Sequence, residues 1–165
     1  MKRTEFTKRI AQVPMFATLP RPELEHLAHT LRPCEFTPGA LLMREGECDE
    51  RFYILLDGEV EVIKALGTSD ERQLAIKSGG SLFGEMSLFN PQGCHTASVR
   101  AMTAAHALEM TRQDFDALLH RRPTLVYDMM RQMSQRLEES ENATILDLRE
   151  KNRQLTQAYQ ELQAA

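Results

Sequence analysis

The residues whose types and spacing point most clearly to chemistry lie in residues 82–99, with the sequence LFGEMSLFNPQGCHTASV. Gly84 and Glu85 form a short turn there, and residues 86–89 then have the apolar spacing of a single helical turn. The start of such a turn leaves backbone N–H groups without helical partners, and these groups attract an anion. The Glu85 carboxylate would repel a phosphate but would accept hydrogen bonds from a hydroxyl group. This segment therefore predicts a binding site for a ligand that carries both a phosphate and a ribose hydroxyl.

The same segment resembles the phosphate-binding cassette of cyclic nucleotide-binding domains. That cassette has the pattern F/I-G-E-x-A/S/G-L, a loop, and then R-T/S/A-A-x-V, and the chain matches it at residues 83–88 and 96–99. The resemblance implies that Glu85 holds the ribose 2′-hydroxyl, that backbone amides hold the cyclic phosphate, and that Thr96 touches phosphate or base. The ligand-binding residues that it predicts in the cassette are Phe83, Gly84, Glu85, Met86, Ser87, His95, Thr96 and Ala97.

The chain departs from this pattern at His95, which stands where the family has its phosphate-binding arginine. Arginine stays charged and contacts phosphate through two donors, whereas histidine loses its charge near neutral pH and offers one donor in that direction. Losing a charge-assisted pair costs on the order of 1.5–3 kcal/mol, or roughly ten- to more than a hundredfold in affinity. Two alternatives stay open: a cassette that binds its ligand through histidine, and a domain that has lost its ligand.

Other candidate chemistry is weaker. The neighbouring Cys94 and His95 would suit haem as in gas-sensing relatives, but one such pair is thin support, and we predict no cofactor. His26 and His29 have the spacing of two metal ligands, but a catalytic metal site needs a third, so we expect a solvated helix face. No nucleophile–base pair, carboxylate pair or lysine-centred cluster stands out, which favours a binding module over an enzyme.

Composition points to a soluble globular protein. Of the 165 residues, 42% are apolar and 27% charged, and the net charge of −4 argues mildly against a general nucleic-acid binder. No apolar run approaches the length of a membrane span, and the start of the chain lacks the apolar core of a signal peptide. Cys34, Cys48 and Cys94 are odd in number and unclustered, which predicts reduced thiols in a cytoplasmic protein.

The elements that must position the cassette are mainly short strands. From Cys34 to about Thr111, roughly eight β-type runs recur at intervals of about 8–12 residues, separated by turns such as Glu45-Gly46 and Asp57-Gly58. This spacing predicts an antiparallel jelly roll or barrel, and the family resemblance covers the whole region.

Helices flank this β region. Residues 4–31 read as two helical pieces, the second of which ends at Pro33, and a short helix begins at about Arg112 and ends at Pro123. The predicted fold is thus mainly β with flanking helices and a long C-terminal helix. We divide it into a cyclic nucleotide-binding-like domain at residues 1–122 and a dimerising helix at residues 123–165.

The long helix carries a heptad pattern. Leucines at 148, 155 and 162 are seven residues apart and alternate with positions 145, 152 and 159, which places Asn152 at an a position. An interval of eleven residues between Leu137 and Leu148 introduces one stutter. We expect a parallel homodimer, with a lone solvated helix as the alternative.

The run at residues 132–137 resembles the central helix of the catabolite activator subfamily, which is bacterial. By that resemblance, Ser140 falls where a hydroxyl meets the base of the nucleotide, and Glu141 falls where the opposite subunit reaches across. The transcription factors of this family continue into a helix-turn-helix, which the 165 residues do not contain, so we expect no direct DNA binding.

Together these patterns predict a regulatory module that binds cAMP, cGMP or a related small molecule and signals through a dimeric helix. The helix runs to Ala165 without a Gly or Pro stop, which suggests a longer natural chain and an output unit such as a phosphatase, kinase or cyclase. The rival prediction is a ligand-free scaffold that only dimerises.

Overall fold

A computed structural model describes residues 2–164, apart from the side chains of Phe89 and Gln132. The chain divides into two compact units, the first ending at Arg121 and the second beginning at Arg122. The first unit holds all eight strands that the structure describes, and the second is a single long helix.

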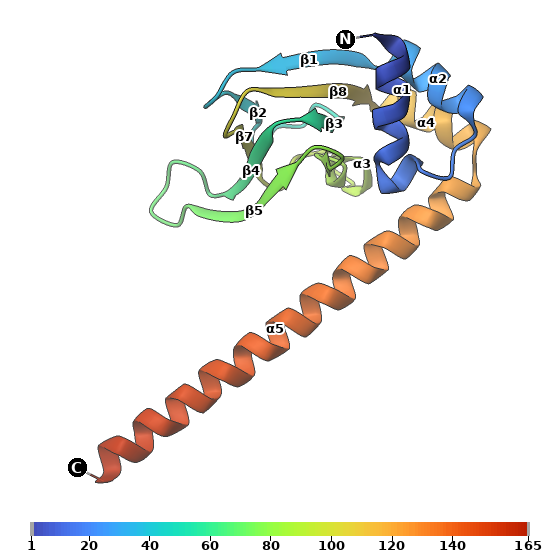
Figure 1. Ribbon diagram of the computed structural model, residues 1–165. Coiled ribbons are helices and arrows are strands. Elements are labelled where there is room, and N and C mark those ends of the chain that lie inside the picture. Colours follow the sequence, from blue (N-terminus) through green and yellow to red (C-terminus); the bar gives the residue numbers. More distant parts are fainter. Residues whose placement is uncertain (1, 165) are drawn as a thin grey trace. The chain divides into compact units, whose positions relative to one another are not determined.

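Two four-stranded antiparallel sheets form the centre of the first unit (Figure 1). The first sheet has the order β1-β8-β3-β6, built from Arg32–Phe36, Ala105–Thr111, Arg51–Asp57 and Leu82–Phe83. The second has the order β2-β7-β4-β5, built from Leu41–Met43, Ser98–Ala101, Glu59–Lys64 and Arg72–Ser78. These sheets confirm the predicted antiparallel jelly roll.

The core packs side chains from both sheets. Tyr53 of β3 stacks on Phe83 of β6 with ring centroids 5.3 Å apart, and β3 buries five consecutive residues, 52–56. On β4 the buried residues are Val60 and Ile63 rather than a strict alternation, because a bulge shifts the register between residues 62 and 63. The buried Phe83 brings the cassette into contact with this core.

Short helices flank the sheets. α1 spans Arg3–Gln12, η1 spans Pro14–Phe16, α2 spans Arg21–Thr30 and α4 spans Arg112–Arg121, and in Figure 1 they gather at one end of the sheets. The expectation that Pro33 ends the second helix is wrong. α2 ends at Thr30, and Pro33 already lies in β1, where the fixed φ of proline suits an extended chain.

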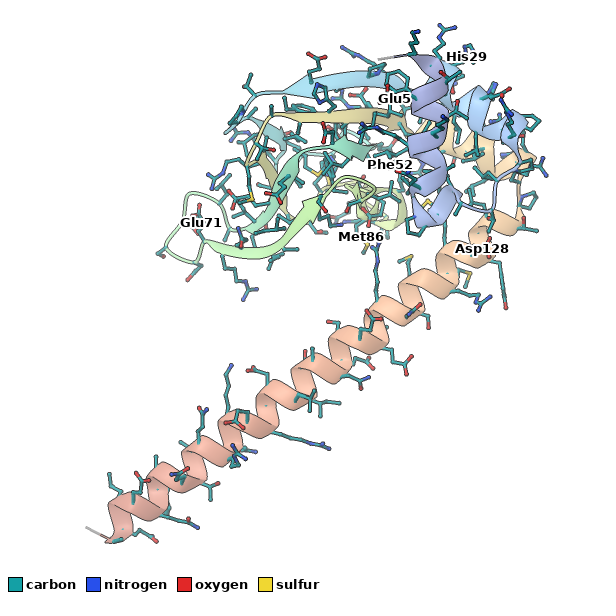
Figure 2. The ribbon with its side chains drawn as sticks, in the orientation of Figure 1. Glu5, His29, Phe52, Glu71, Met86 and Asp128 are labelled. Atoms are coloured by element: carbon teal, nitrogen blue, oxygen red, sulfur yellow. A yellow bond between two sulfur atoms is a disulfide. The ribbon has the colours of Figure 1, made fainter. Side chains whose placement is uncertain are left out.

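His26 and His29 are both exposed on α2, as expected for a solvated face, and Figure 2 labels His29 there.

The second unit consists of α5, Thr124–Ala164, a helix of 41 residues. Its apolar heptad positions are exposed: Leu148 by 58%, Leu155 by 69% and Leu162 by 80%. Burying apolar surface such as this stripe of leucines against a partner contributes roughly 25 cal/mol of favourable free energy for each Å² removed from water. No described helix is apolar enough over a sufficient length to cross a membrane.

Candidate nucleotide-binding site

The cassette lines a pocket of about 140 Å³ against the second sheet. All eight predicted residues, Phe83, Gly84, Glu85, Met86, Ser87, His95, Thr96 and Ala97, lie in its wall. The other lining residues come from the strands: Met43, Val62, Ala75, Lys77 and Val99. Figure 2 labels Met86, which marks the cassette on α3, Met86–Phe89. The structure thus brings residues 83–87 and residues 95–97 to one cavity.

Gly84 sets the path of the chain into the pocket. Its φ of +84° lies in the left-handed region, which side chains rarely adopt. A Cβ at this position would lie 2.4 Å from Cε of Met43 and 3.2 Å from the carbonyl oxygen of Arg51. The positive φ therefore favours glycine, and any side chain here would also displace the end of the Met43 side chain. The turn that Gly84 makes directs Glu85 to the pocket.

The turn after Gly84 is held by its own hydrogen bonds. Glu85 is 9% exposed and Ser87 is fully buried. The Ser87 hydroxyl donates to the Gly84 carbonyl oxygen at 2.8 Å. The N–H groups of Ser87 and Leu88 donate to the carbonyl oxygens of Gly84 and Glu85 at 3.2 and 3.0 Å. These two amides already have protein partners, so fewer donors are left for an anion than the sequence pattern suggests.

The second half of the cassette is joined to the loop before β3. The N–H of His95 donates to the carbonyl oxygen of Glu47, and the N–H of Gly46 donates to the carbonyl oxygen of His95, each at 2.8 Å. A disulfide links Cys48 to Cys94 beside these two bonds. The prediction of unclustered, reduced thiols is therefore wrong for this pair, because the fold brings together residues that are 46 positions apart. Cys34 is the free cysteine.

The His95 side chain contacts a carboxylate that the sequence did not single out. Its Nε2 lies 2.5 Å from Oδ1 of Asp49, and only 1% of the side chain is exposed. Arg51 lies 3.4 Å from the other oxygen of Asp49 and 3.5 Å from Glu109, whose Oε2 accepts a hydrogen bond from the Tyr53 hydroxyl. Nδ1 of His95 is buried and has no hydrogen-bond partner among the described residues.

The contacts that run from His95 through Asp49, Arg51 and Glu109 end at Tyr53, which lies in the hydrophobic core. Burial, reinforced by the negative charge of Glu109, raises the pKa of Tyr53 to about 12. The Tyr53 phenol is therefore a neutral donor at physiological pH.

The loop that carries Gly46 is also anchored. Nζ of Lys64 lies 2.6 Å from Glu45 and donates to the carbonyl oxygen of Thr96 at 2.7 Å. The hydrogen bond from Lys64 lowers the pKa of Glu45, and a second bond from the Ala65 N–H acts in the same direction. Lys64 thus links β4 to the loop at Glu45 and to Thr96, the residue after His95.

Lys77 is a functional candidate that sequence reasoning missed. It extends from β5 into the pocket wall, and its Nζ donates to the carbonyl oxygen of Leu82 at 2.6 Å. The only sequence signal for it is the alternation of β5, which identifies a face of the strand but not the pocket that the face meets.

Ser140 and Glu141 lie on α5, in the second unit, where both are exposed and border a shallow hollow with Thr144 and Ile145. Their expected contacts with the base and with the opposite subunit remain predictions.

Comparisons with known proteins identify the relatives of this chain. The family model described as "Cyclic nucleotide-binding domain" matches residues 33–122. The "CRP-like cAMP-activated global transcriptional regulator" of Mycobacterium tuberculosis is 28% identical over 133 residues, which are 81% of this chain and 59% of that protein. The chain thus spans somewhat more than half the length of this relative.

Solved structures extend the likeness to the fold. The catabolite activator protein of Thermus thermophilus superposes with a TM-score of 0.72 at 27% identity, over 81% of this chain and 62% of that one. The regulatory subunit of a cAMP-independent protein kinase A from Trypanosoma cruzi, bound to guanosine, gives 0.64 at 29% identity, over 72% and 41%. With a family model that matches more than half of its residues and a cassette assembled around one pocket, the chain belongs to the cyclic nucleotide-binding domain family.

Proposed function

We propose that this chain is a regulatory module that binds cAMP, cGMP or a related nucleoside-type ligand in the cassette pocket and transmits the bound state through α5. The observation that carries the proposal is the convergence of the eight cassette residues on one cavity, among them Glu85, a residue that is only 9% exposed. A carboxylate accepts hydrogen bonds, and the hydroxyl groups of a ribose donate them.

The relatives support the ligand class. One is named as cAMP-activated, and another is described with guanosine bound. These relatives are regulators rather than catalysts by name, in keeping with a binding role here. We propose that the module acts without an enzymatic step and without contacting DNA itself.

Transmission through α5 requires a partner for its apolar stripe. We propose that a second copy of the chain covers it, because Leu148, Leu155 and Leu162 are exposed at heptad spacing with Asn152 at an a position. Two Asn152 side chains meeting in a parallel dimer can hydrogen-bond each other, whereas a shifted register leaves each against leucine. We further propose that the natural chain continues into an output domain.

A ligand-free scaffold is the second candidate function. It is favoured by His95 in the arginine position and by the Asp49 carboxylate at its Nε2, which together remove a strong phosphate contact. In this case α5 alone would carry the function.

Calorimetric titration of the purified protein separates the two candidates. The titrants are cAMP, cGMP, adenosine and guanosine, and the sensor function predicts saturable one-to-one binding of at least one of them. Absence of binding by all four at millimolar concentration would favour the scaffold.

A further inference from the structure

We propose that the Cys48–Cys94 disulfide is a redox switch for the cassette pocket: the oxidised chain binds its ligand, and reduction of the disulfide by a dithiol weakens binding. The disulfide joins the loop before β3 to the second half of the cassette, where Cys94 directly precedes His95 of the pocket wall. The inference rests on the proposed function, because it concerns the regulation of the same pocket.

The disulfide joins two segments without regular secondary structure. Residues 44–50 and 93–97, all of which the structure describes, form neither helix nor strand. Residues 95–97 nevertheless line the pocket. Their position therefore depends on links to neighbouring segments, and the disulfide is a covalent one. Such a link reduces the conformational freedom that this part of the wall loses when a ligand binds, which favours affinity.

Two hydrogen bonds connect the same segments beside the disulfide. The N–H of His95 donates to the carbonyl oxygen of Glu47, and the N–H of Gly46 donates to the carbonyl oxygen of His95, each at 2.8 Å. Glu47 and His95 are the direct neighbours of Cys48 and Cys94 in the chain. When the disulfide opens, these hydrogen bonds hold the two loops without it, and contacts between loops open more easily than those inside a sheet. Reduction therefore loosens this part of the wall without removing it.

The disulfide is placed for exchange with a dithiol, because Cys48 is exposed and Cys94 is half-buried. A thiolate of the dithiol attacks Sγ of Cys48, the Sγ–Sγ bond breaks, and Cys94 leaves as a thiolate that takes up a proton. The second thiol of the dithiol then attacks the mixed disulfide, which releases Cys48 as a thiol and leaves the reductant as a disulfide. Two electrons and two protons pass to the protein, and exchange with a disulfide oxidant reverses the step.

The third cysteine, Cys34, is a poor participant in this exchange. Burial, reinforced by the negative charge of Glu109, raises the pKa of the Cys34 thiol, so less of it is present as the reactive thiolate. Cys34 lies on β1, in the first sheet, and is not among the pocket-lining residues that the structure describes. It therefore provides a control for the reductant.

The inference is tested by calorimetric titration of the 165-residue protein with cAMP, cGMP, adenosine and guanosine, before and after reduction with dithiothreitol. We expect the tightest of these ligands to bind about tenfold or more weakly after reduction, because the wall is less preorganised. Reoxidation with glutathione disulfide should restore the affinity. The number of titratable thiols should rise from one to three on reduction, and circular dichroism should show that the reduced chain is folded.

Two variants separate the disulfide from other effects of the reductant. Cys34→Ser keeps the disulfide and should respond to dithiothreitol like the unaltered chain. The double variant Cys48→Ser, Cys94→Ser has no disulfide, so it should bind as weakly as the reduced chain and should not respond to the reductant. If the double variant does not fold, reduction and reoxidation of the unaltered chain still decide the inference.

The possible results are distinct. Equal or tighter binding after reduction would overturn the inference and leave the sensor function intact. A disulfide that dithiothreitol does not open in the folded chain, or a reduced chain that is unfolded, would also overturn it, because the disulfide would then be a purely structural bond. No binding by any titrant in either state would overturn the inference together with the sensor function.

Discussion

At the scale of single residues, Glu85 gives the most direct test of the cassette. Glu85→Ala should weaken binding of a ribose ligand about tenfold or more, because a charge-assisted hydrogen bond to the 2′-hydroxyl is lost. The same substitution should leave binding of the 2′-deoxy counterpart almost unchanged. Calorimetry with both ligands measures the difference, and Glu35→Ala, an exposed carboxylate on β1, is the control. Equal losses for both ligands would contradict this role of Glu85.

Tyr53 gives a prediction at alkaline pH. An unfolded tyrosine ionises near pH 10, whereas burial and Glu109 raise the pKa of Tyr53 to about 12 in the folded chain. Between these values the unfolded state releases a proton that the folded state keeps, so the free energy of unfolding should fall as pH rises from about 10 to 12.

Spectrophotometric titration measures this directly, since the chain has three tyrosines. The component with a pKa of about 12 should be absent in Tyr53→Phe and present in Tyr159→Phe, which removes an exposed tyrosine of α5. A late component that persists in Tyr53→Phe would assign it to another residue.

At the scale of elements, the Cys48–Cys94 disulfide joins the loop before β3 to the second half of the cassette. Its reduction should lower the free energy of unfolding by about 2–4 kcal/mol, because the unfolded chain loses a long closed loop. Urea unfolding with and without a dithiol reductant measures this change. The double variant Cys48→Ser, Cys94→Ser should not respond to the reductant, whereas Cys34→Ser should respond like the unaltered chain. Equal midpoints with and without reductant would contradict the stabilising role.

The long helix makes a separate prediction at Asn152. Asn152→Leu should raise the thermal midpoint, because a buried polar pair is replaced by apolar packing, but it should also admit oligomers other than the parallel dimer. Thermal unfolding and sedimentation together measure both effects. A lower midpoint with an unchanged dimer would show that Asn152 does not occupy the helix interface.

At the scale of the whole molecule, the prediction is a dimer. Light scattering at tens of micromolar should give twice the chain mass of 18.9 kDa. Lysine substitution of Leu148 and Leu155 together should dissociate the dimer. Lysine at Leu146, which is 64% exposed but lies outside the a and d positions, should not. A monomer of the unaltered chain would remove the dimer and with it the proposed route through α5.

The sequence by itself determined the features that depend on residues close together in the chain. The Gly84-Glu85 turn, the spacing of the strands and the heptads of α5 follow from which residues stand one to seven positions apart. The jelly roll could be predicted for this reason, whereas the eight cassette residues of the pocket wall were predicted from the resemblance to a known family. The limits of the elements were less accurate, as Pro33 in β1 shows, because a proline also fits an extended chain.

The tertiary structure alone decided which distant residues meet. Cys48 and Asp49 lie opposite Cys94 and His95, so one pair forms a disulfide and the next a hydrogen-bonded contact. Lys77 reaches the pocket only because β5 pairs with β4. Contacts between residues far apart in the chain depend on how the loops close and on strand register. A shift of one residue in the register of β5 would turn Lys77 to the other face of the sheet. The partner of the His95 side chain therefore could not be predicted from local spacing.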